Sequence, residues 1–281
     1  MKLLVTGVTG ILGRALVVEG RRRGWEVQGA YHHRPPEGPE LEGIRLEPLV
    51  AHDLEQVRRF LGRVRPDALV NAVGLTRARC RDPREAWIAN AYAPRILGAC
   101  ARAMEVRMVH VSTDCVFKGD RGPFWEDDLP DAVDVYGRSK AAGELKDPAL
   151  TVRTSFVGRE VGSAHGLLAW FLAQEGAVQG WKNHLWSGLA APCLARILLD
   201  LALSPEVTGL LHVHGEDTTK AELLRLLARA TGHAIPIEEV EAQRAIDRRL
   251  RSTRLAGLGI EVPPLAEQLT ELAASLPGDR P

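Results

Sequence analysis

The sequence predicts an α/β fold: a doubly wound parallel (Rossmann) sheet followed by a smaller C-terminal substrate lobe. Short apolar runs alternate with helical patterns up to about residue 158, and a glycine-rich turn follows the first run directly. An apolar run bounded by glycine is typical of a buried parallel strand. Repeated βαβ units with right-handed crossovers build a doubly wound sheet. We therefore expect a dinucleotide-binding Rossmann domain over residues 1–158 and a substrate-binding lobe over residues 159–281, with parts that interleave.

Apolar periodicity, proline and glycine place the elements of the first half. Leu54, Val57, Leu61 and Val64 recur at helical spacing, and the pair Asp147-Pro148 ends a later helix. The expected strands are Leu3–Val5, Glu26–Tyr31, Ile44–Val50, Asp67–Val73, Arg107–Ser112 and Leu150–Val157. The expected helices are Ile11–Arg22, Leu54–Val64, Arg84–Met104 and Val135–Lys146. A loop rich in proline and glycine fills residues 32–43, and a charged, glycine-containing loop runs from Asp114 to about Asp131.

The second half has a less regular pattern. We expect helices at Ala164–Gln174 and Pro192–Leu203, one that starts near Thr218, and a terminal amphipathic helix at Leu265–Leu276. Short strands are expected at Leu210–His214 and Ile235–Val240. We expect this lobe to cover the carboxyl ends of the strands, where open α/β sheets bind ligands.

The composition is that of an ordinary globular protein. Among 281 residues, 45% are hydrophobic and 26% charged, and the formal net charge is zero. This balance does not favour nucleic acid or an anionic membrane surface as a partner. The first strand begins at once, which argues against a signal peptide, and no apolar run reaches the ~18 residues of a membrane span. The four cysteines show no C-x-x-C spacing, so free thiols in the cytoplasm are expected.

Gly7, Gly10 and Gly13 lie between the first strand and the first helix, the context that a dinucleotide-binding glycine motif requires. Gly7 allows a tight turn, Gly10 allows a phosphate to approach the backbone, and Gly13 allows the helix to pack close to the strand. The amides at the start of the helix then point at the anion. The residues expected at this phosphate site are Gly7, Thr9, Gly10, Ile11, Leu12 and Gly13.

The end of the second expected strand favours NADP(H) over NAD(H). An acidic residue there would bind the adenosine ribose of NAD, whereas this chain continues with His32, His33 and Arg34. Arg34 and His32 can pair with a 2′-phosphate. The alternative is that Arg34 is a solvated loop residue and that both cofactors are accepted. Asp53, with Leu54 beside it, is a candidate contact for the adenine, or else Asp53 is the N-cap of the next helix.

Tyr136 and Lys140 are four residues apart on an expected helix, so they share one face. A nearby ammonium, together with an oxidised nicotinamide, lowers the pKa of a phenol and suits it to acid–base chemistry. A hydroxyl at the end of the fifth strand, from Ser112 or Thr113, would bond the substrate oxygen. The pattern indicates redox chemistry at a carbonyl carbon.

In these segments the chain resembles the extended short-chain dehydrogenases/reductases, and within them the dTDP-4-dehydrorhamnose reductase group. The matching segments are VTGVTGILGRAL, RPDALVNAVGLT, AWIANAYAP, VSTDCVF, VYGRSKAAGE and VRTSFVG. The resemblance implies reduction of a 4-keto-hexose attached to dTDP, with NADPH or NADH. It also implies that Thr113 is the catalytic threonine, Tyr136 the proton donor and Lys140 its partner.

The resemblance adds three residues to the cofactor site. Asn90 matches the asparagine whose helix lies behind the nicotinamide, and Ala72 and Val73 match the turn after the fourth strand that lies against the cofactor. The chain departs from the reductase pattern at Phe156, where the pattern has tryptophan, and in the segment KNHLWSGLAAP. It also has Ala78-Arg79-Cys80-Arg81-Asp82 in place of the usual V-D-x-x-E stretch. These departures concern the substrate more than the cofactor.

Two other functions stay open. One is a nucleotide-sugar epimerase or dehydratase with a bound NAD, although the acidic residue that would support it is absent. The other is a non-catalytic NADP-binding regulatory subunit, because the regulatory subunit of methionine adenosyltransferase has a similar sequence pattern. We expect a nucleotide-sugar substrate and a homodimer. No metal is expected, because the spacing of the histidines at 165, 184, 212 and 214 fits no ligand motif.

Some features of the second half allow two interpretations. Trp170, Trp181 and Trp186 are core residues by default or a stacking surface for a base or sugar. Arg153 is a structural ion-pair partner or a phosphate contact. The arginines of the segment DRRLRST (247–253) form a solvated face or bind a diphosphate.

Overall fold

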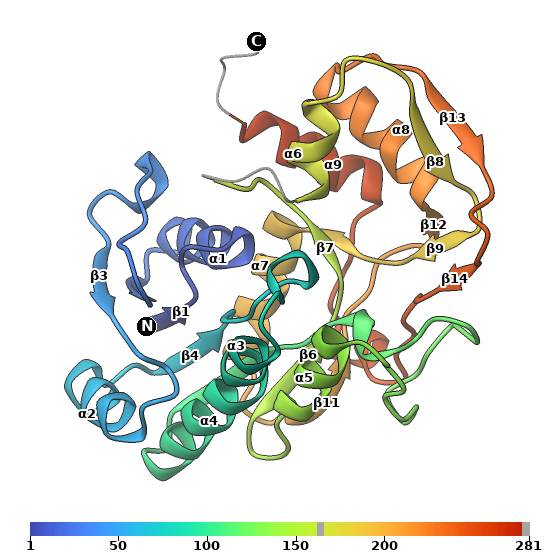
Figure 1. Ribbon diagram of the computed structural model, residues 1–281. Helices are drawn as coiled ribbons and strands as arrows, with labels where there is room; N and C mark the ends of the chain where they lie inside the picture. Colours follow the sequence, from blue (N-terminus) through green and yellow to red (C-terminus); the bar gives the residue numbers. More distant parts are fainter. Residues whose placement is uncertain (162–165, 277–281) are drawn as a thin grey trace.

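The computed structural model describes residues 1–161 and 166–276, and its centre is a parallel sheet of seven strands (Figure 1). The strand order is β11-β6-β5-β4-β1-β2-β3, and every neighbouring pair is parallel. The strands are β1 (Lys2–Thr6), β2 (Glu26–Tyr31), β3 (Arg45–Pro48), β4 (Ala68–Asn71), β5 (Arg107–Val111), β6 (Leu150–Arg153) and β11 (Gly209–His212). The order reverses between β1 and β4, and open α/β sheets bind ligands at such a switch point. The expected Rossmann sheet is therefore confirmed.

Successive residues of a strand point to opposite faces of the sheet, so alternate residues pack into two separate apolar cores. Leu3 and Val5 pack against α1 (Ile11–Arg22) and α7 (Ala191–Ala202) on one face of the sheet. Leu4 packs on the other face, in a core built with α2 (Leu54–Val64) and α4 (Ala93–Ala103). Two layers of helices thus cover the sheet and leave the carboxyl ends of its strands for the site.

The long helix expected at 84–104 is present but is interrupted by a π-helical turn. It consists of α3 (Pro83–Trp87), a π-helical turn (Ile88–Tyr92) and α4. Pro94 follows this turn, and it lacks the N–H that would bond the Asn90 carbonyl in a regular α-helix. That carbonyl instead lies against Gly143 of α5 (Val135–Gly143), where a Cβ would clash with it. The interruption therefore lets α5 approach the α3–α4 segment closely.

The expected strand 150–157 is two strands, because the chain leaves the central sheet after β6. The following β7 (Phe156–Val157) pairs with β10 (Leu189–Ala190). The upper right of Figure 1 shows the remaining layer. It contains α6 (Leu167–Leu172), β8 (Val178–Trp181), β9 (His184–Trp186), β12 (Thr218–Thr219), α8 (Lys220–Thr231), β13 (Ile237–Val240), β14 (Ile246–Asp247) and α9 (Leu265–Ala274). Its small sheets have the orders β12-β9-β14 and β13-β8, and its own apolar core joins α6, α8 and α9.

Elements from the second half of the chain also belong to the Rossmann layer. Helix α7 packs on α1, and β11 pairs with β6, so part of the second half completes the Rossmann layer. The boundary at residue 158 stays a prediction. The helix expected at 164–174 is observed over Leu167–Leu172, while 164 and 165 lie outside the described residues. In the described part of the chain, no helix is long and apolar enough to cross a membrane.

Candidate active site

The glycine turn between β1 and α1 is held tightly against the end of β4. Gly7 has a φ of +83°, and a Cβ there would lie 2.7 Å from the Ala72 carbonyl carbon and 2.8 Å from the Val73 nitrogen. A Cβ on Gly13 would clash with the Gly7 carbonyl, so the helix can approach the turn only with glycine at that position. The turn thus brings Ala72 and Val73 beside the glycine motif, and their contact with the cofactor stays a prediction.

The outer side of this turn is open and suits a dinucleotide phosphate. Thr9 and Gly10 are exposed, and Gly10 is the N-cap of α1 with no side-chain cap. The amides of Ile11, Leu12 and Gly13 therefore lie at a helix N-terminus, where unpaired N–H groups attract anions. Among the described residues, a Cβ on Gly10 would have the Gly7 carbonyl oxygen as its near neighbour, at 3.4 Å. These residues fit the pyrophosphate of NADP(H).

A cluster of imidazoles lies at the end of β2, where the adenosine ribose of a dinucleotide binds in this fold. The rings of His32 and His33 are 3.8 Å apart between centroids, and His52 lies 6.1 Å from His32. Arg34 is exposed beside them. Burial lowers the pKa of His32, and the charges of His33 and His52 lower it further. The sequence indicated His32 and Arg34 but missed the contribution of His52, which comes from the loop before α2.

Asp53 is engaged at the start of α2. Its carboxylate accepts a hydrogen bond from the Gln56 amide at 2.9 Å, so it is the N-cap of that helix. Leu54 follows it and is exposed. Of the two roles considered for Asp53, the structure shows the cap, and a contact with the adenine stays a prediction.

Asn90 is fully buried in the π-helical turn, and it fixes the loop that follows β4. Its Oδ1 accepts the Leu75 N–H at 2.8 Å, and its Nδ2 donates to the Leu75 carbonyl at 3.2 Å. Nδ2 also donates to the Ser139 hydroxyl at 3.1 Å, one residue before Lys140. A Cβ on Gly74 would lie 3.1 Å from Asn90 Oδ1 and 3.6 Å from Lys140 Nζ. Asn90 therefore shapes the wall beside Lys140.

Thr113, Tyr136 and Lys140 meet at the carboxyl end of β5. The Thr113 hydroxyl accepts the Cys115 N–H at 3.1 Å and donates to Asp114 at 3.1 Å. The half-buried Tyr136 is close enough to Thr113 for a hydrogen bond between their side chains to lower its pKa. Lys140 is buried, and its ammonium donates to the Val111 carbonyl at 2.7 Å. The three predicted catalytic residues are thus gathered at one place.

The structure distinguishes Thr113 from Ser112, which sequence reasoning left as alternatives. The Ser112 hydroxyl donates to Glu144 at 2.7 Å. Glu144 also holds Arg153 through two hydrogen bonds of 2.7 and 2.8 Å, in a largely buried ion pair. Ser112 is therefore committed to this pair, and Arg153 is a structural partner. Glu144 was not indicated by the sequence.

Burial moves the pKa values of the two titratable residues in opposite directions. The pKa of Lys140 falls to about 8, because burial disfavours the ammonium more than the nearby Glu144 stabilises it. Burial raises the pKa of Tyr136, with contributions from Cys115, Asp114 and Cys80 that exceed the hydrogen bond from Thr113. The expected lowering of the Tyr136 pKa is therefore not seen in the free protein, because burial dominates. A neutral phenol is the form that can donate a proton.

A buried polar chain connects the glycine turn to the region of Lys140. The Thr6 hydroxyl donates to Asn71 Oδ1 at 2.7 Å, and Asn71 Nδ2 donates to His110 Nδ1 at 3.0 Å. His110 is fully buried, and burial together with the charge of Lys140 keeps its pKa well below the usual value. Its Nε2 has no hydrogen-bond partner among the described residues. The chain holds Asn71, which in turn accepts the Val73 N–H at 3.1 Å.

The C-terminal layer offers fewer free groups than its sequence suggested. Trp186 is buried, and its Nε1 donates to Ser155 at 2.7 Å, so it is not a stacking surface. Arg249 and Arg251 bind Asp217 at 2.7 and 2.6 Å, so neither guanidinium is free for a diphosphate. Lys220 was not indicated by the sequence, and its ammonium lies 4.7 Å from the centroid of the Trp186 ring.

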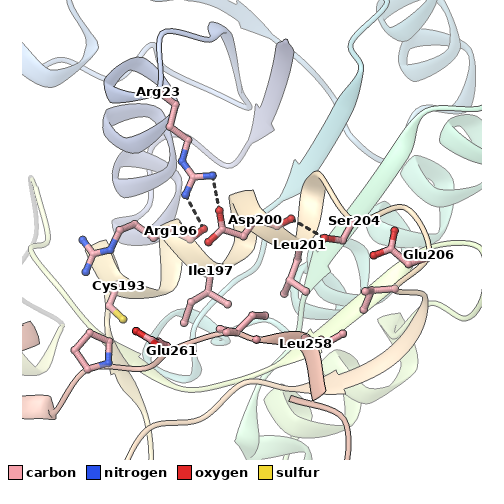
Figure 2. A pocket seen from close by; sticks show the side chains of 14 residues that line it. Arg23, Cys193, Arg196, Ile197, Asp200, Leu201, Ser204, Glu206, Leu258 and Glu261 are labelled. Carbon is pink, nitrogen blue, oxygen red and sulfur yellow. Dashed lines mark hydrogen bonds and ion pairs between the residues drawn. The ribbon is translucent and has the colours of Figure 1, made fainter. Parts of the chain in front are cut away.

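A separate pocket of about 520 Å³ lies between α7 and the segment 258–263 (Figure 2). Arg23 and Asp200 form an ion pair of 2.7 Å at its rim. None of Thr113, Tyr136 and Lys140 lines it.

Residues 1–161 and 166–276 contain no group of three or more His, Cys, Asp or Glu side chains that could hold a metal ion. His165, considered above with three other histidines, lies outside the described residues.

Comparisons with known proteins agree with this geometry. The model of the family described as RmlD substrate binding domain matches residues 1–276. A probable low-salt glycan biosynthesis reductase of Haloferax volcanii is 30% identical over 241 residues, which cover 83% of this chain and 74% of that protein. Methionine adenosyltransferase 2 subunit beta of Rattus norvegicus is 25% identical over 92% of this chain and 83% of its own length. The fold matches dTDP-4-dehydrorhamnose reductase of Bacillus anthracis in complex with NADP, with a TM-score of 0.80, 20% identity and coverage of 98% and 99%.

Proposed function

The chain belongs to the RmlD substrate binding domain family, and from this premise we propose that it is an NADP(H)-dependent reductase of a 4-keto nucleotide sugar. The observation that carries the proposal is the meeting of Thr113, Tyr136 and Lys140 at the end of β5, beside the wall that Asn90 fixes. The glycine turn at the switch point of the sheet provides a matching site for the dinucleotide.

Each residue of the site has a distinct part in the reaction. NADPH, when bound, supplies the hydride for the keto carbon. Tyr136 donates a proton to the keto oxygen, which its raised pKa permits because the phenol stays neutral at physiological pH. The Thr113 hydroxyl rotates its proton from Asp114 to that oxygen and orients it by a hydrogen bond. Lys140 provides a positive charge that stabilises the phenolate left on Tyr136.

The Lys140 ammonium retains N–H groups that can bind a ligand, and this supports its role. Its ammonium donates one hydrogen bond to Val111 and no other bond among the described residues. Its remaining N–H groups can hold the ribose of a bound nicotinamide nucleotide. The family pattern also assigns this position to the partner of the proton donor. NADP(H) is favoured because Arg34 offers positive charge at the end of β2, His32 can take up a proton beside a phosphate, and the segment 32–34 contains no carboxylate.

Substitution of Tyr136 tests the proposal. We expect the purified protein to oxidise NADPH with dTDP-4-dehydrorhamnose, and Tyr136→Phe to lower kcat by about 10²–10⁴-fold because the proton donor is lost. The dissociation constant for NADPH should change by less than about twofold, since the ring remains. Tyr92→Phe, at an exposed position, is the matched control and should keep full activity. Turnover that survives in Tyr136→Phe would exclude this assignment.

A non-catalytic regulatory subunit is the second candidate, favoured by the 25% identity with methionine adenosyltransferase 2 subunit beta over 92% of this chain. The same assay separates the two. Tight binding of NADPH without turnover of any 4-keto nucleotide sugar would support the regulatory role. The intact set of Thr113, Tyr136 and Lys140 makes the reductase the first choice.

We also propose that two copies associate through an exposed apolar patch on α3 and the π-helical turn. Trp87, Ile88 and Tyr92 are 40%, 40% and 57% exposed and surround a shallow hollow with Ala142 of α5. Exposed apolar patches of this kind commonly mark subunit contacts, and a twofold axis would pair the patch with itself. Light scattering should report a dimer, and Ile88→Glu should give a monomer.

The four free thiols favour the cytoplasm as the compartment.

A further inference from the structure

We propose that Lys220 binds the diphosphate of the nucleotide-sugar substrate and so positions the sugar at Thr113, a role that rests on the proposed reductase function. Lys220 is the first residue of α8, directly after the N-cap Thr219. It belongs to the C-terminal layer, while Thr113 belongs to the Rossmann sheet. The two parts of the chain are brought together by the small sheet β12-β9-β14.

Hydrogen bonds tie that small sheet to the segment that follows Thr113. Strand β12, just before Lys220, pairs with β9, with Thr218 opposite Trp186. At the other side of β9, the Asp247 amide donates to the Gly119 carbonyl at 2.8 Å. The Arg248 guanidinium donates to the Phe117 carbonyl at 2.8 Å. The start of α8 is therefore fixed relative to the segment 113–119.

Charged groups of this segment act on Lys220. Asp114 and Cys115 favour its charged form, and Arg248 disfavours it. Burial lowers the pKa of Lys220 more than these neighbours raise it. Asp114 is the residue that accepts the hydrogen bond from the Thr113 hydroxyl. Lys220 and the catalytic threonine therefore share Asp114 as a neighbour.

No carboxylate of the described residues lies within ion-pair distance of Lys220, although Asp114 is a neighbour. Among residues 1–161 and 166–276, its ammonium forms no hydrogen bond or ion pair, and it lies 4.7 Å from the centroid of the Trp186 ring. Trp186 is fixed from behind by Ser155 and packs against Gly188. A partly buried cation held over a rigid ring is expected to bind an anion, because burial without a counter-ion is costly.

Three other cations of this layer already have partners. Arg248 donates to two backbone carbonyls, and Arg249 and Arg251 bind Asp217. A substrate diphosphate therefore finds its free donor in Lys220, with Arg248 adding positive potential beside it. A neutral sugar hydroxyl would not offset the buried charge, so the diphosphate is the group that the site favours.

Inhibition by dTDP, compared with inhibition by thymidine, tests this role. We expect Lys220→Met to raise the KM for dTDP-4-dehydrorhamnose and the inhibition constant of dTDP by about tenfold or more, the loss of one charge-assisted contact. The inhibition constant of thymidine, which has no phosphate, and kcat should change by less than about threefold. Lys220→Arg should restore part of the affinity, and Lys182→Met, at an exposed lysine of the same layer, should behave as the wild type.

The dissociation constant of NADPH distinguishes binding of the substrate diphosphate by Lys220 from binding of the cofactor diphosphate. This constant should be unchanged in Lys220→Met. Three results would overturn the inference while the wild-type enzyme remains active: an unchanged KM and dTDP inhibition, an equal loss for dTDP and thymidine, or an equal loss for NADPH. The second result would indicate a structural role over Trp186. Failure of the wild type to turn over any 4-keto nucleotide sugar would instead contradict the proposed function itself.

Discussion

The side chain of Asn90 binds both polar atoms of the Leu75 backbone, with hydrogen bonds of 2.8 Å to its N–H and 3.2 Å to its carbonyl. The buried carboxamide of Asn90 thereby takes the place of a backbone partner for Leu75, which lies in the loop that follows β4. The same side chain contacts Ser139, on the helix that carries Tyr136 and Lys140. The loop after β4 and the catalytic helix are therefore placed relative to each other by one residue.

Asn90→Ala should destabilise the protein by about 1–3 kcal/mol, because it leaves the Leu75 amide without its partner and the Leu75 carbonyl with only the Cys80 thiol, at 3.7 Å. We also expect weaker binding of NADPH, since the wall beside Lys140 loses its support. Urea denaturation and a fluorescence titration with NADPH measure the two effects. Ser139→Ala removes one bond to Asn90 but keeps both bonds to Leu75, so its effect should be smaller. Equal effects for the two variants would contradict this role of Asn90.

Gly13→Ala should abolish binding of the dinucleotide, because a Cβ at this position clashes with the carbonyl of Gly7. Either α1 moves away from the turn or the turn itself is distorted, and both changes remove the phosphate site. Gly62→Ala is the matched control in α2, where the nearest atom to a new Cβ is 3.9 Å away. That control should raise stability by roughly 0.5–1 kcal/mol, since alanine favours a helix. Calorimetric titration with NADPH would show whether Gly13→Ala still binds.

Local patterns in the sequence were sufficient to predict the Rossmann half of the fold. Leu3, Leu4 and Val5 form a continuous apolar run because both faces of β1 are covered, and the glycine turn has the spacing that Gly7 and Gly13 require. The short strands β9 and β12 escaped prediction because two or three residues are too few to show a period. The pairing of β11 with β6 depends on contacts between distant segments, which no local pattern reports.

Some features of the candidate site could likewise be predicted from local sequence, and others could not. Tyr136 and Lys140 are one helical turn apart, so their shared face could be read from their spacing. The choice between Ser112 and Thr113 could not, because it depends on Glu144, a residue from another element that binds the Ser112 hydroxyl. Lys220 escaped notice because a single lysine at a helix start is ordinary. Only the hydrogen bonds of Asp247 and Arg248 to the segment 117–119, together with the pairing of β12 with β9, give it significance.

The reductase activity should fall as the pH rises through about 8, the value to which burial lowers the pKa of Lys140. Below this pH the ammonium is present and stabilises the Tyr136 phenolate. Above it the lysine becomes neutral, while Tyr136 stays protonated because its own pKa is raised. Profiles of kcat/KM against pH should show this decrease as a limb at high pH. Lys140→Arg keeps its charge at all these pH values, so its profile should lack the limb at a lower overall rate. An unchanged limb in this variant would assign the ionisation to another group.

The same buried lysine has an opposite effect on folding. The folded-state pKa of Lys140 is about 8, below the ~10.4 of an unfolded chain, so between these values the unfolded chain binds more protons. The contribution of this group to the free energy of unfolding therefore rises with pH over that interval. Lys140→Met should remove the contribution, and urea denaturation at a series of pH values would detect the difference. A steeper dependence on pH in the variant would contradict the assignment.

Binding of NADPH should take up protons at the imidazole cluster, whereas binding of NADH should not. In the free protein the pKa of His32 is lowered by burial and by His33 and His52, so His32 is neutral near pH 7. A 2′-phosphate beside it would favour the imidazolium and raise that pKa, so NADPH affinity should increase as the pH falls toward 6.5. Calorimetric titrations in buffers of different ionisation enthalpy count the protons. His32→Asn should lower the uptake with NADPH and leave NADH binding unchanged, while equal uptake with both cofactors would place the 2′-phosphate away from this cluster.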